Sequence, residues 1–295
     1  MNNFKKYYLK NNGYISNAIE NKKLTFEEYN NFIKEFDKLS ESEIEIYKNQ
    51  NTKMLLVKKE ILNYFIINNI LFHENFYIGR QIDNNLIKYL SWNLLYGFDK
   101  KPFCDEIALL QKSWDKVTQT EINKSLIGEY RKDNMEKRIN GNDIYFTRFK
   151  FIPDLMDQNL EIFMKTINNP SSTIQIIFEA IWVFHLNFEL IHPFVEGNGR
   201  VGRILADIMH IQNKLVPISF SKEGKKLYEE VINNLLGPLQ SNFEKPKLFN
   251  ALPIEFKKFI YNEFDREYQY TLEHEISFEI NDLFPNSKTL LNIIK

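Results

Sequence analysis

Residues 192–203, which read HPFVEGNGRVGR, gather side chains suited to phosphate chemistry within a short stretch. The stretch joins an apolar segment to a second apolar segment at 204–209, so the pattern predicts a tight polar loop between two helices. The first amides and the dipole of the second helix favour a bound anion. Gly197 and Gly199 lack the Cβ atoms that would keep an anion from the backbone, so the segment is typical of a phosphate-binding loop.

The side chains of this loop divide into an anion site, a metal ligand and a base. Arg200 and Arg203 are three residues apart and share a helix face, where each guanidinium can bind two phosphate oxygens, and Asn198 adds a neutral donor. Glu196 is a hard oxygen ligand, and a carboxylate beside phosphate favours a bridging divalent cation such as Mg²⁺. His192 is the one residue here suited to take a proton from a hydroxyl at neutral pH. A triphosphate suits this set better than a single phosphate.

Each of these features also has an ordinary structural explanation. A histidine beside Pro193 and Phe194 is commonly a loop or core residue, two glycines before a helix commonly form a turn, and arginines three apart commonly decorate a solvated face. Phosphate chemistry explains all of them together, whereas the structural explanations require separate coincidences. The combination therefore favours a functional site.

Residues 192–203 resemble the signature of the Fic family, His-Pro-Phe-x-(Asp or Glu)-Gly-Asn-Gly-Arg-x-x-Arg, at all nine specified positions. The resemblance covers about residues 85–236 and includes Gly128, Tyr130 and Arg131. It implies an all-α, mainly helical Fic fold. It also implies an adenylyltransferase that moves AMP from ATP to a Ser, Thr or Tyr hydroxyl of a target protein or of itself, releasing pyrophosphate.

The resemblance also implies individual roles. His192 would be the catalytic base, Glu196 would bind Mg²⁺ or Mn²⁺, and Arg203 would hold the γ-phosphate of ATP. Tyr228 falls where the family has residues that line the adenine pocket. The implied ATP phosphate-binding residues are Gly197, Asn198, Gly199, Arg200 and Arg203.

A second segment near the start, residues 16–21 with the sequence SNAIEN, resembles the family's inhibitory motif (Ser or Thr)-x-x-x-Glu-(Gly or Asn). The resemblance implies that Ser16, Glu20 and Asn21 inhibit the enzyme, with Glu20 occupying the arginine that the γ-phosphate needs. Residues 219–224, SFSKEG, satisfy the same pattern. The first copy is favoured because the residues on both sides of its glutamate also resemble the family.

Helical periodicity dominates the rest of the chain, so we expect mostly helices to position this loop. A capping box at residues 25–28 predicts a helix running toward Leu39. Further helices are expected at about 54–71, 85–95, 153–164, 174–190 and 222–236, with a cap for the fourth at residues 170–172. The apolar stretch 174–191 is interrupted by polar residues and is expected to be a buried core helix rather than a membrane span.

One segment reads as β structure. Asn140 and Gly141 form the strongest short hairpin signal, because both tolerate the positive φ of a type I′ turn, and the side chains that follow alternate in character. The segment resembles the target-binding flap of the Fic family, which would lie before the catalytic helix-loop-helix. The flap residues implied are Asp143, Ile144, Tyr145, Phe146 and Thr147.

Composition narrows the class of protein. Thirty-eight basic and 39 acidic residues give a net charge of −1, so no overall field would attract nucleic acid or an anionic membrane. Cys104 is the single cysteine, which excludes an internal disulfide framework, and the N-terminus does not read as a secretory signal. We therefore expect a cytoplasmic protein.

The expected organisation is an inhibitory helical segment at 1–50, a Fic domain at 51–240 with an insertion at about 98–126, and a C-terminal extension at 241–295.

Other functions stay open. Kinase-like members of the superfamily, of the death-on-curing type, transfer phosphate instead of AMP, but they depart from the Gly-Asn-Gly-Arg core that is intact here. Some members with a built-in inhibitory glutamate also remove AMP. A non-catalytic interaction module is the alternative from another class, and the intact His192 and Arg200 argue against it. The sequence decides neither the target nor the oligomeric state, so a homodimer stays open.

Overall fold

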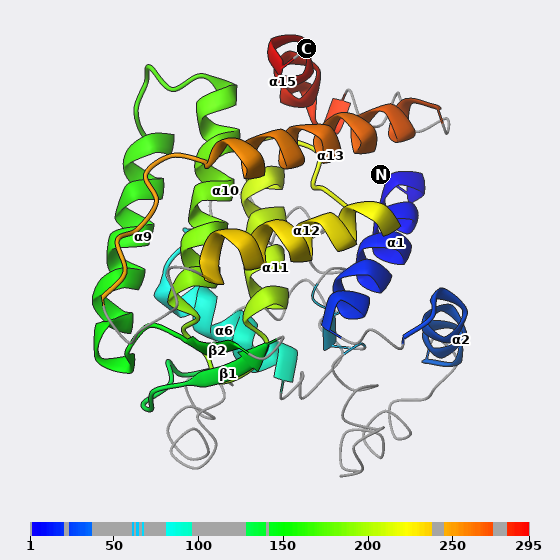
Figure 1. The fold of residues 1–295 in the computed structure, drawn as a ribbon. Coiled ribbons are helices and arrows are strands. Elements are labelled where there is room, and N and C mark those ends of the chain that lie inside the picture. The colour runs from blue at the N-terminus through cyan, green and yellow to red at the C-terminus, as the bar shows by residue number, and fades with distance from the viewer. Residues whose placement is uncertain are drawn as a thin grey trace.

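The computed structural model describes residues 2–20, 24–36, 61, 63–64, 67, 81–95, 128–139, 142–237, 245–273 and 282–294. Within these ranges the regular structure is almost entirely helical, which confirms the predicted fold class (Figure 1). The helices are α1 (Asn2–Glu20), α2 (Phe26–Phe36), α6 (Asn84–Leu95), α9 (Ile152–Ile167), α10 (Ile174–Ile191), α11 (Asn198–Gln212), α12 (Lys222–Leu236), α13 (Ile254–Glu273) and α15 (Pro285–Ile294). A short 3₁₀ turn, η2 (Phe149–Phe151), precedes α9.

Helix α10 forms the centre of the hydrophobic core. It is apolar nearly all round, and α9 and α11 pack on either side of it, as expected for a helix buried within a bundle (Figure 1). Its length and mean hydropathy would also suit a membrane span, but 72% of it is buried inside the protein, which is typical of a core helix. The sequence-based expectation of a buried core helix at this position agrees with the structure.

Local signals explain where several helices begin. Thr25 and Glu28 form a capping box, in which the Glu28 amide donates to the Thr25 hydroxyl at 3.2 Å and the Thr25 amide donates to the Glu28 carboxylate at 2.8 Å. Helix α2 begins at Phe26, directly after Thr25. Proline lies in the first turn of α9 as predicted. The cap of α10 was expected at residues 170–172 but is Thr173, whose hydroxyl accepts from the Ile176 amide at 3.3 Å. The helix predicted at residues 54–71 and the insertion predicted at 98–126 lie largely outside the described residues.

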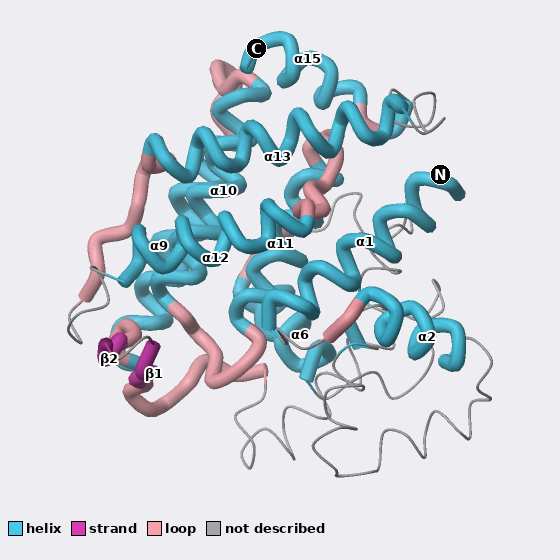
Figure 2. The backbone as a smooth tube through the Cα atoms, turned by 45° about the vertical axis from the view of Figure 1, so that its right-hand side comes forward, coloured by secondary structure: helices cyan, strands magenta, loops and turns pink. Residues whose placement is uncertain are grey.

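Strands β1 (Glu136–Ile139) and β2 (Asn142–Tyr145) pair antiparallel in a register that places Arg138 opposite Asp143. The expected Asn140–Gly141 turn lies outside the described residues. Figure 2 shows the pair at one end of the helical bundle, and the stacking of Phe146, just after β2, on His192 places it beside the turn between α10 and α11. The function of this pair as a target-binding flap stays a prediction.

The two ends of the chain pack on this bundle. Helix α1 contacts α11 and α12, while α13 contacts α12, and α15 contacts α10 and α13 (Figure 1). Phe4 near the N-terminus meets Phe284 near the C-terminus edge to face, with ring centroids 5.3 Å apart. The N-terminal segment and the C-terminal extension are therefore neighbours in space. The domain boundaries expected from the sequence stay predictions.

Candidate active site

His192 stands at the turn between the two central helices. It caps the C-terminus of α10 in the left-handed conformation (φ 51°, ψ 63°), and its amide donates to the Phe188 carbonyl at 2.9 Å. A non-glycine residue in this region is uncommon and often marks a functional position. The imidazole stacks on the ring of Phe146, with centroids 4.0 Å apart and planes 20° from parallel. Phe146, just after β2, thus helps to orient the imidazole.

Arg131 fixes the backbone around this histidine. Its Nε donates to the His192 carbonyl at 2.9 Å, and its backbone amide donates to the Pro193 carbonyl at 2.9 Å. The same guanidinium donates to the carbonyls of Asp133 and Thr147, next to the hairpin. Burial lowers the pKa of Arg131 to about 10, so it remains charged at neutral pH. Arg131 is a positioning residue that links the hairpin to the loop.

The loop closes tightly onto the start of α11. Gly197 adopts a positive φ of 80° immediately before the helix, a conformation that favours glycine. The Asn198 carboxamide bridges the loop, accepting from the Phe194 amide at 2.9 Å and donating to the Phe194 carbonyl at 2.8 Å. This side chain thus shapes the loop, and its expected donation to phosphate stays a prediction. Its backbone amide remains part of the helix N-terminus, where an anion would bind.

The two arginines lie on the first turns of α11 and are largely buried, with exposed fractions of 6% for Arg200 and 4% for Arg203. Arg203 donates from Nε to the Ser16 hydroxyl at 2.8 Å and from a terminal nitrogen to the Ser16 carbonyl at 3.1 Å. Its guanidinium also lies over the Tyr228 ring, 5.9 Å from the centroid. The structure therefore brings Ser16, the serine of residues 16–21, to Arg203. Glu20 ends α1 one turn later, and its side chain and Asn21 lie outside the described residues.

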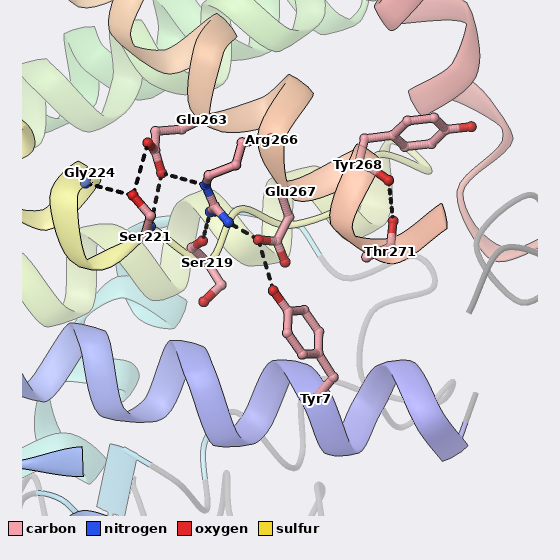
Figure 3. Close-up of polar contacts among 9 residues, drawn as sticks. All are labelled: Tyr7, Ser219, Ser221, Gly224, Glu263, Arg266, Glu267, Tyr268 and Thr271. Atoms are coloured by element: carbon pink, nitrogen blue, oxygen red, sulfur yellow. Dashed lines mark hydrogen bonds and ion pairs between the residues drawn. The ribbon is translucent and has the colours of Figure 1, made fainter. Parts of the chain in front are cut away.

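The competing motif at 219–224 has a structural role in the same molecule. Ser221 caps α12 by accepting from the Gly224 amide at 2.7 Å, while Glu223 is exposed on the first turn. The Ser219 carbonyl accepts from Arg266 of α13 (Figure 3). A side chain at Gly224 would come within 2.5 Å of the Glu263 carboxylate, so this glycine allows close packing of α12 on α13. Residues 219–224 therefore cap α12 and pack it on α13 in this structure.

The Tyr228 ring beneath the Arg203 guanidinium belongs to a buried polar cluster. His185 and the Tyr228 hydroxyl share a hydrogen bond of 2.8 Å. Burial, followed by the positive charge of Arg203, lowers the pKa of His185 to about 3, so this histidine is neutral. Tyr228 itself is buried and stacks on Phe220 with centroids 5.0 Å apart. Its expected contact with adenine therefore stays a prediction, while its contact with Arg203 is direct.

Asp207 is a site residue that the sequence-based reasoning missed. It is buried one turn beyond Arg203 on α11 and accepts from the Asn12 carboxamide of α1 at 3.1 Å. Burial raises the pKa of Asp207 to about 7, against the hydrogen bonds from Tyr8 and Asn12. The available signal was an acidic residue within an otherwise apolar helical segment. Asp207 and Arg203 together give α11 two polar contacts to α1.

Glu196 is exposed in the loop, next to the N-terminus of α11. No cluster of three or more His, Cys, Asp or Glu side chains able to hold a metal ion occurs in the described part of the chain. Mg²⁺ is often bound by one or two carboxylates, with substrate phosphates and water completing its shell. A single exposed carboxylate beside a helix N-terminus fits that arrangement.

These features define a helical protein whose central helix-loop-helix places two buried arginines on the first turns of a helix beside a fixed histidine. The model of the Fic/DOC family matches residues 84–210, so this part of the chain is similar to a Fic/DOC family domain. A Fic-domain-containing signaling protein from Bacteroides thetaiotaomicron has the same fold, with a TM-score of 0.60 over 87% of this chain and 83% of that chain at 17% identity.

Two curated relatives bear on the activity. A probable protein adenylyltransferase of Aquifex aeolicus is 36% identical over 99 residues, which cover 32% of this chain and 28% of that protein. The protein adenylyltransferase fic-1 of Caenorhabditis elegans is 25% identical over 141 residues, which cover 46% of this chain and 27% of that protein. The chain thus spans little more than a quarter of the length of these relatives.

Proposed function

We propose that the chain transfers AMP from ATP to a Ser, Thr or Tyr hydroxyl of a target protein, or to its own hydroxyl groups. One observation carries this proposal most strongly. Two buried arginines, Arg200 and Arg203, flank a helix N-terminus that begins six residues after a conformationally fixed histidine, His192. Anion binding and proton removal are thereby combined at one place. The names of the two curated relatives agree with this reaction.

In the proposed reaction, the target hydroxyl oxygen attacks the α-phosphorus of ATP. Its proton passes to His192, a new bond forms between oxygen and α-phosphorus, and the bond to the β-phosphate bridging oxygen breaks. Pyrophosphate leaves. The amides at the start of α11, with Arg200 and Arg203, hold the phosphates, since positioning and charge stabilisation supply most of the catalysis in such transfers.

Mg²⁺ or Mn²⁺ fits this site through Glu196, which the structure leaves exposed beside the phosphate-binding helix N-terminus. The cation would supply positive charge to the phosphate groups of ATP. Arg200 and Arg203 supply fixed positive charge from the protein.

We further propose that α1 inhibits this reaction. The Ser16 hydroxyl and carbonyl already accept from Arg203, which places the motif helix against the arginine assigned to the γ-phosphate. Glu20 follows one turn along the same helix and would add a carboxylate there. A γ-phosphate and this carboxylate would then compete for one guanidinium.

Incubation with ATP labelled at either the α- or the γ-phosphate tests the proposed reaction. AMP transfer places the α-label, and not the γ-label, on protein. Incorporation of the γ-label alone would establish phosphate transfer instead. Binding of ATP without incorporation of either label would support the non-catalytic alternative. Loss of label from a purified AMP-modified protein would reveal the reverse activity.

The hairpin is proposed to bind an extended segment of the target by strand addition. Phe146 donates its amide to the Met135 carbonyl at 3.0 Å, and hydrogen-bonded pairs alternate along an antiparallel ladder. In the observed register, the amides of Asp143 and Tyr145 therefore point away from β1, whereas the amide of Ile144 points toward it. Within the described residues, β1 is the one strand that pairs with β2, so the outer edge of β2 can accept a partner.

Asp143→Pro should weaken target modification by about tenfold, because it removes an outward donor while sparing the ladder to β1. The measurement is labelling of lysate proteins from α-labelled ATP, with ATP affinity measured in parallel. Arg138→Pro is the matched control, since it removes an outward amide from the opposite edge. Equal labelling by both variants would reject the outer edge of β2 as the target site. A proline at Thr147 would be a less specific test of target binding, because the Thr147 hydroxyl donates to the Leu190 carbonyl at 3.2 Å and anchors the hairpin.

A further inference from the structure

Helix α13, in the C-terminal extension, presents a charged cluster to α1. Arg266 donates to Glu263 at 3.2 Å and to Glu267 at 3.1 Å, and also to the Ser219 carbonyl (Figure 3). The Glu267 side chain is fully buried, and Tyr7 of α1 donates its hydroxyl to it at 3.3 Å. Buried carboxyl groups are costly unless they are hydrogen-bonded, so these contacts specify one position of α1 against α13.

The contact between the two helices extends beyond this hydrogen bond. The Tyr7 ring stacks on Tyr270 of α13, with centroids 4.7 Å apart and planes 20° from parallel. Burial raises the pKa of Glu267 to about 8, although Arg266 and the Tyr7 hydroxyl favour its charged form. We name Arg266, Glu267 and Tyr270 the α13 clamp.

Helix α1 is held on two different faces. Asn12 and Ser16 are four residues apart and share the face toward α11, where Asn12 donates to Asp207 at 3.1 Å and Ser16 accepts from Arg203 at 2.8 Å. Tyr7 lies on another face and reaches α13. Helix α1 thus contacts the candidate active site on one face and the C-terminal extension on another.

Tyr7, Asn11 and Tyr14 of α1 line a pocket of about 670 Å³, and Arg266 and Tyr270 of α13 line the same pocket. At its edge Tyr7 makes two direct contacts to α13, the hydrogen bond to Glu267 and the stacking on Tyr270. Tyr7 and Ser16 belong to one continuous helix, so loss of a contact at Tyr7 should also loosen the contact of Ser16 with Arg203.

We propose that the α13 clamp holds α1 against Arg203, so that the C-terminal extension controls how firmly the site is inhibited. This proposal rests on the inhibition proposed above. Glu267 and Tyr270 are positioning residues in it, since they act on the site only through α1. The cluster also has a separate function, because Glu263 accepts from the Ser221 amide at 3.0 Å and so supports the start of α12.

Hydrogen–deuterium exchange of α1 in the full-length protein tests the clamp without any catalytic assay. Tyr7→Phe and Glu267→Gln should each make exchange in α1 faster by about tenfold, the factor that corresponds to about 1.4 kcal/mol. Tyr7→Phe keeps the ring and its packing on Tyr270, so it tests the hydrogen bond in a folded protein.

A matched control separates the clamp from general loosening. Tyr14→Phe changes a tyrosine of the same helix whose ring packs on Phe26 of α2, at 5.2 Å between centroids. It should not speed exchange in α1 as Tyr7→Phe does. Exchange in α1 that is unchanged in both Tyr7→Phe and Glu267→Gln would overturn the clamp.

Automodification distinguishes the clamp from the function on which it rests. With faster exchange in α1, a rise in AMP incorporation supports both proposals. Faster exchange without any AMP incorporation, even in Glu20→Gly, would leave the clamp standing and contradict the proposed function.

Discussion

His192→Ala is expected to lower AMP transfer by about 10²–10⁴-fold while ATP affinity changes little. In the proposed reaction the imidazole takes the hydroxyl proton, whereas the α11 amides, Arg200 and Arg203 hold the phosphates. The structure adds a reason for the size of the effect, because Phe146 and Arg131 fix the ring and backbone of this one histidine. Transfer is measured with α-labelled ATP, and affinity by calorimetry.

Arg200→Ala provides the contrasting variant, since it should lose ATP affinity as well as transfer. Thermal unfolding of both variants should show that each remains folded. Wild-type transfer by His192→Ala would remove this residue from the mechanism. A matching loss of ATP affinity in both variants would show instead that His192 acts in binding.

Glu20→Gly is expected to raise automodification by about one to two orders of magnitude. A charge-assisted hydrogen bond between arginine and carboxylate contributes roughly 1.5–3 kcal/mol, and about 1.4 kcal/mol corresponds to a tenfold change. The proposed competition would take place at Arg203, which Ser16 of the same helix contacts. The rate of AMP incorporation into the protein at fixed ATP concentration measures the effect.

Two further variants define where this inhibition acts. Glu20→Gly combined with Arg203→Ala should lose most of the gain, because the γ-phosphate then lacks its arginine. Glu223→Gly should leave the rate unchanged, since Glu223 lies exposed on α12 in a segment that caps that helix and packs on α13. A rise with Glu223→Gly and none with Glu20→Gly would show that the second motif is the inhibitory one. No rise with either would mean that inhibition is not built into this chain.

Local features of this fold were predictable because local chemistry determines them. The capping box at Thr25 and the proline in the first turn of α9 each satisfy helix-end groups through neighbours in the sequence. The N-cap of α10 was predicted at least one residue too early. Ser172 and Thr173 are both favourable N-cap residues, and the sequence does not choose between them. The residues that could bind phosphate were recognisable from type and spacing within a single loop.

Contacts between distant segments were not predictable in the same way. Ser16 and Arg203 are 187 residues apart, and Asn12 and Asp207 are 195 apart, so no local pattern could pair them. The left-handed conformation of His192 also carries no sequence signal, because glycine is the residue that usually marks it. The clamp at α13 depends on a fold that brings the two ends of the chain together, which explains why the extension suggested no function by its sequence alone.

Intact mass spectrometry of the Glu20→Gly protein after incubation with ATP and Mg²⁺ is the most direct test of AMP transfer by this site. AMP transfer predicts a species heavier by one AMP group, and predicts that the species is absent when Glu20→Gly is combined with His192→Ala. A species heavier by a single phosphate, or an unchanged mass in a protein that demonstrably binds ATP, would contradict it.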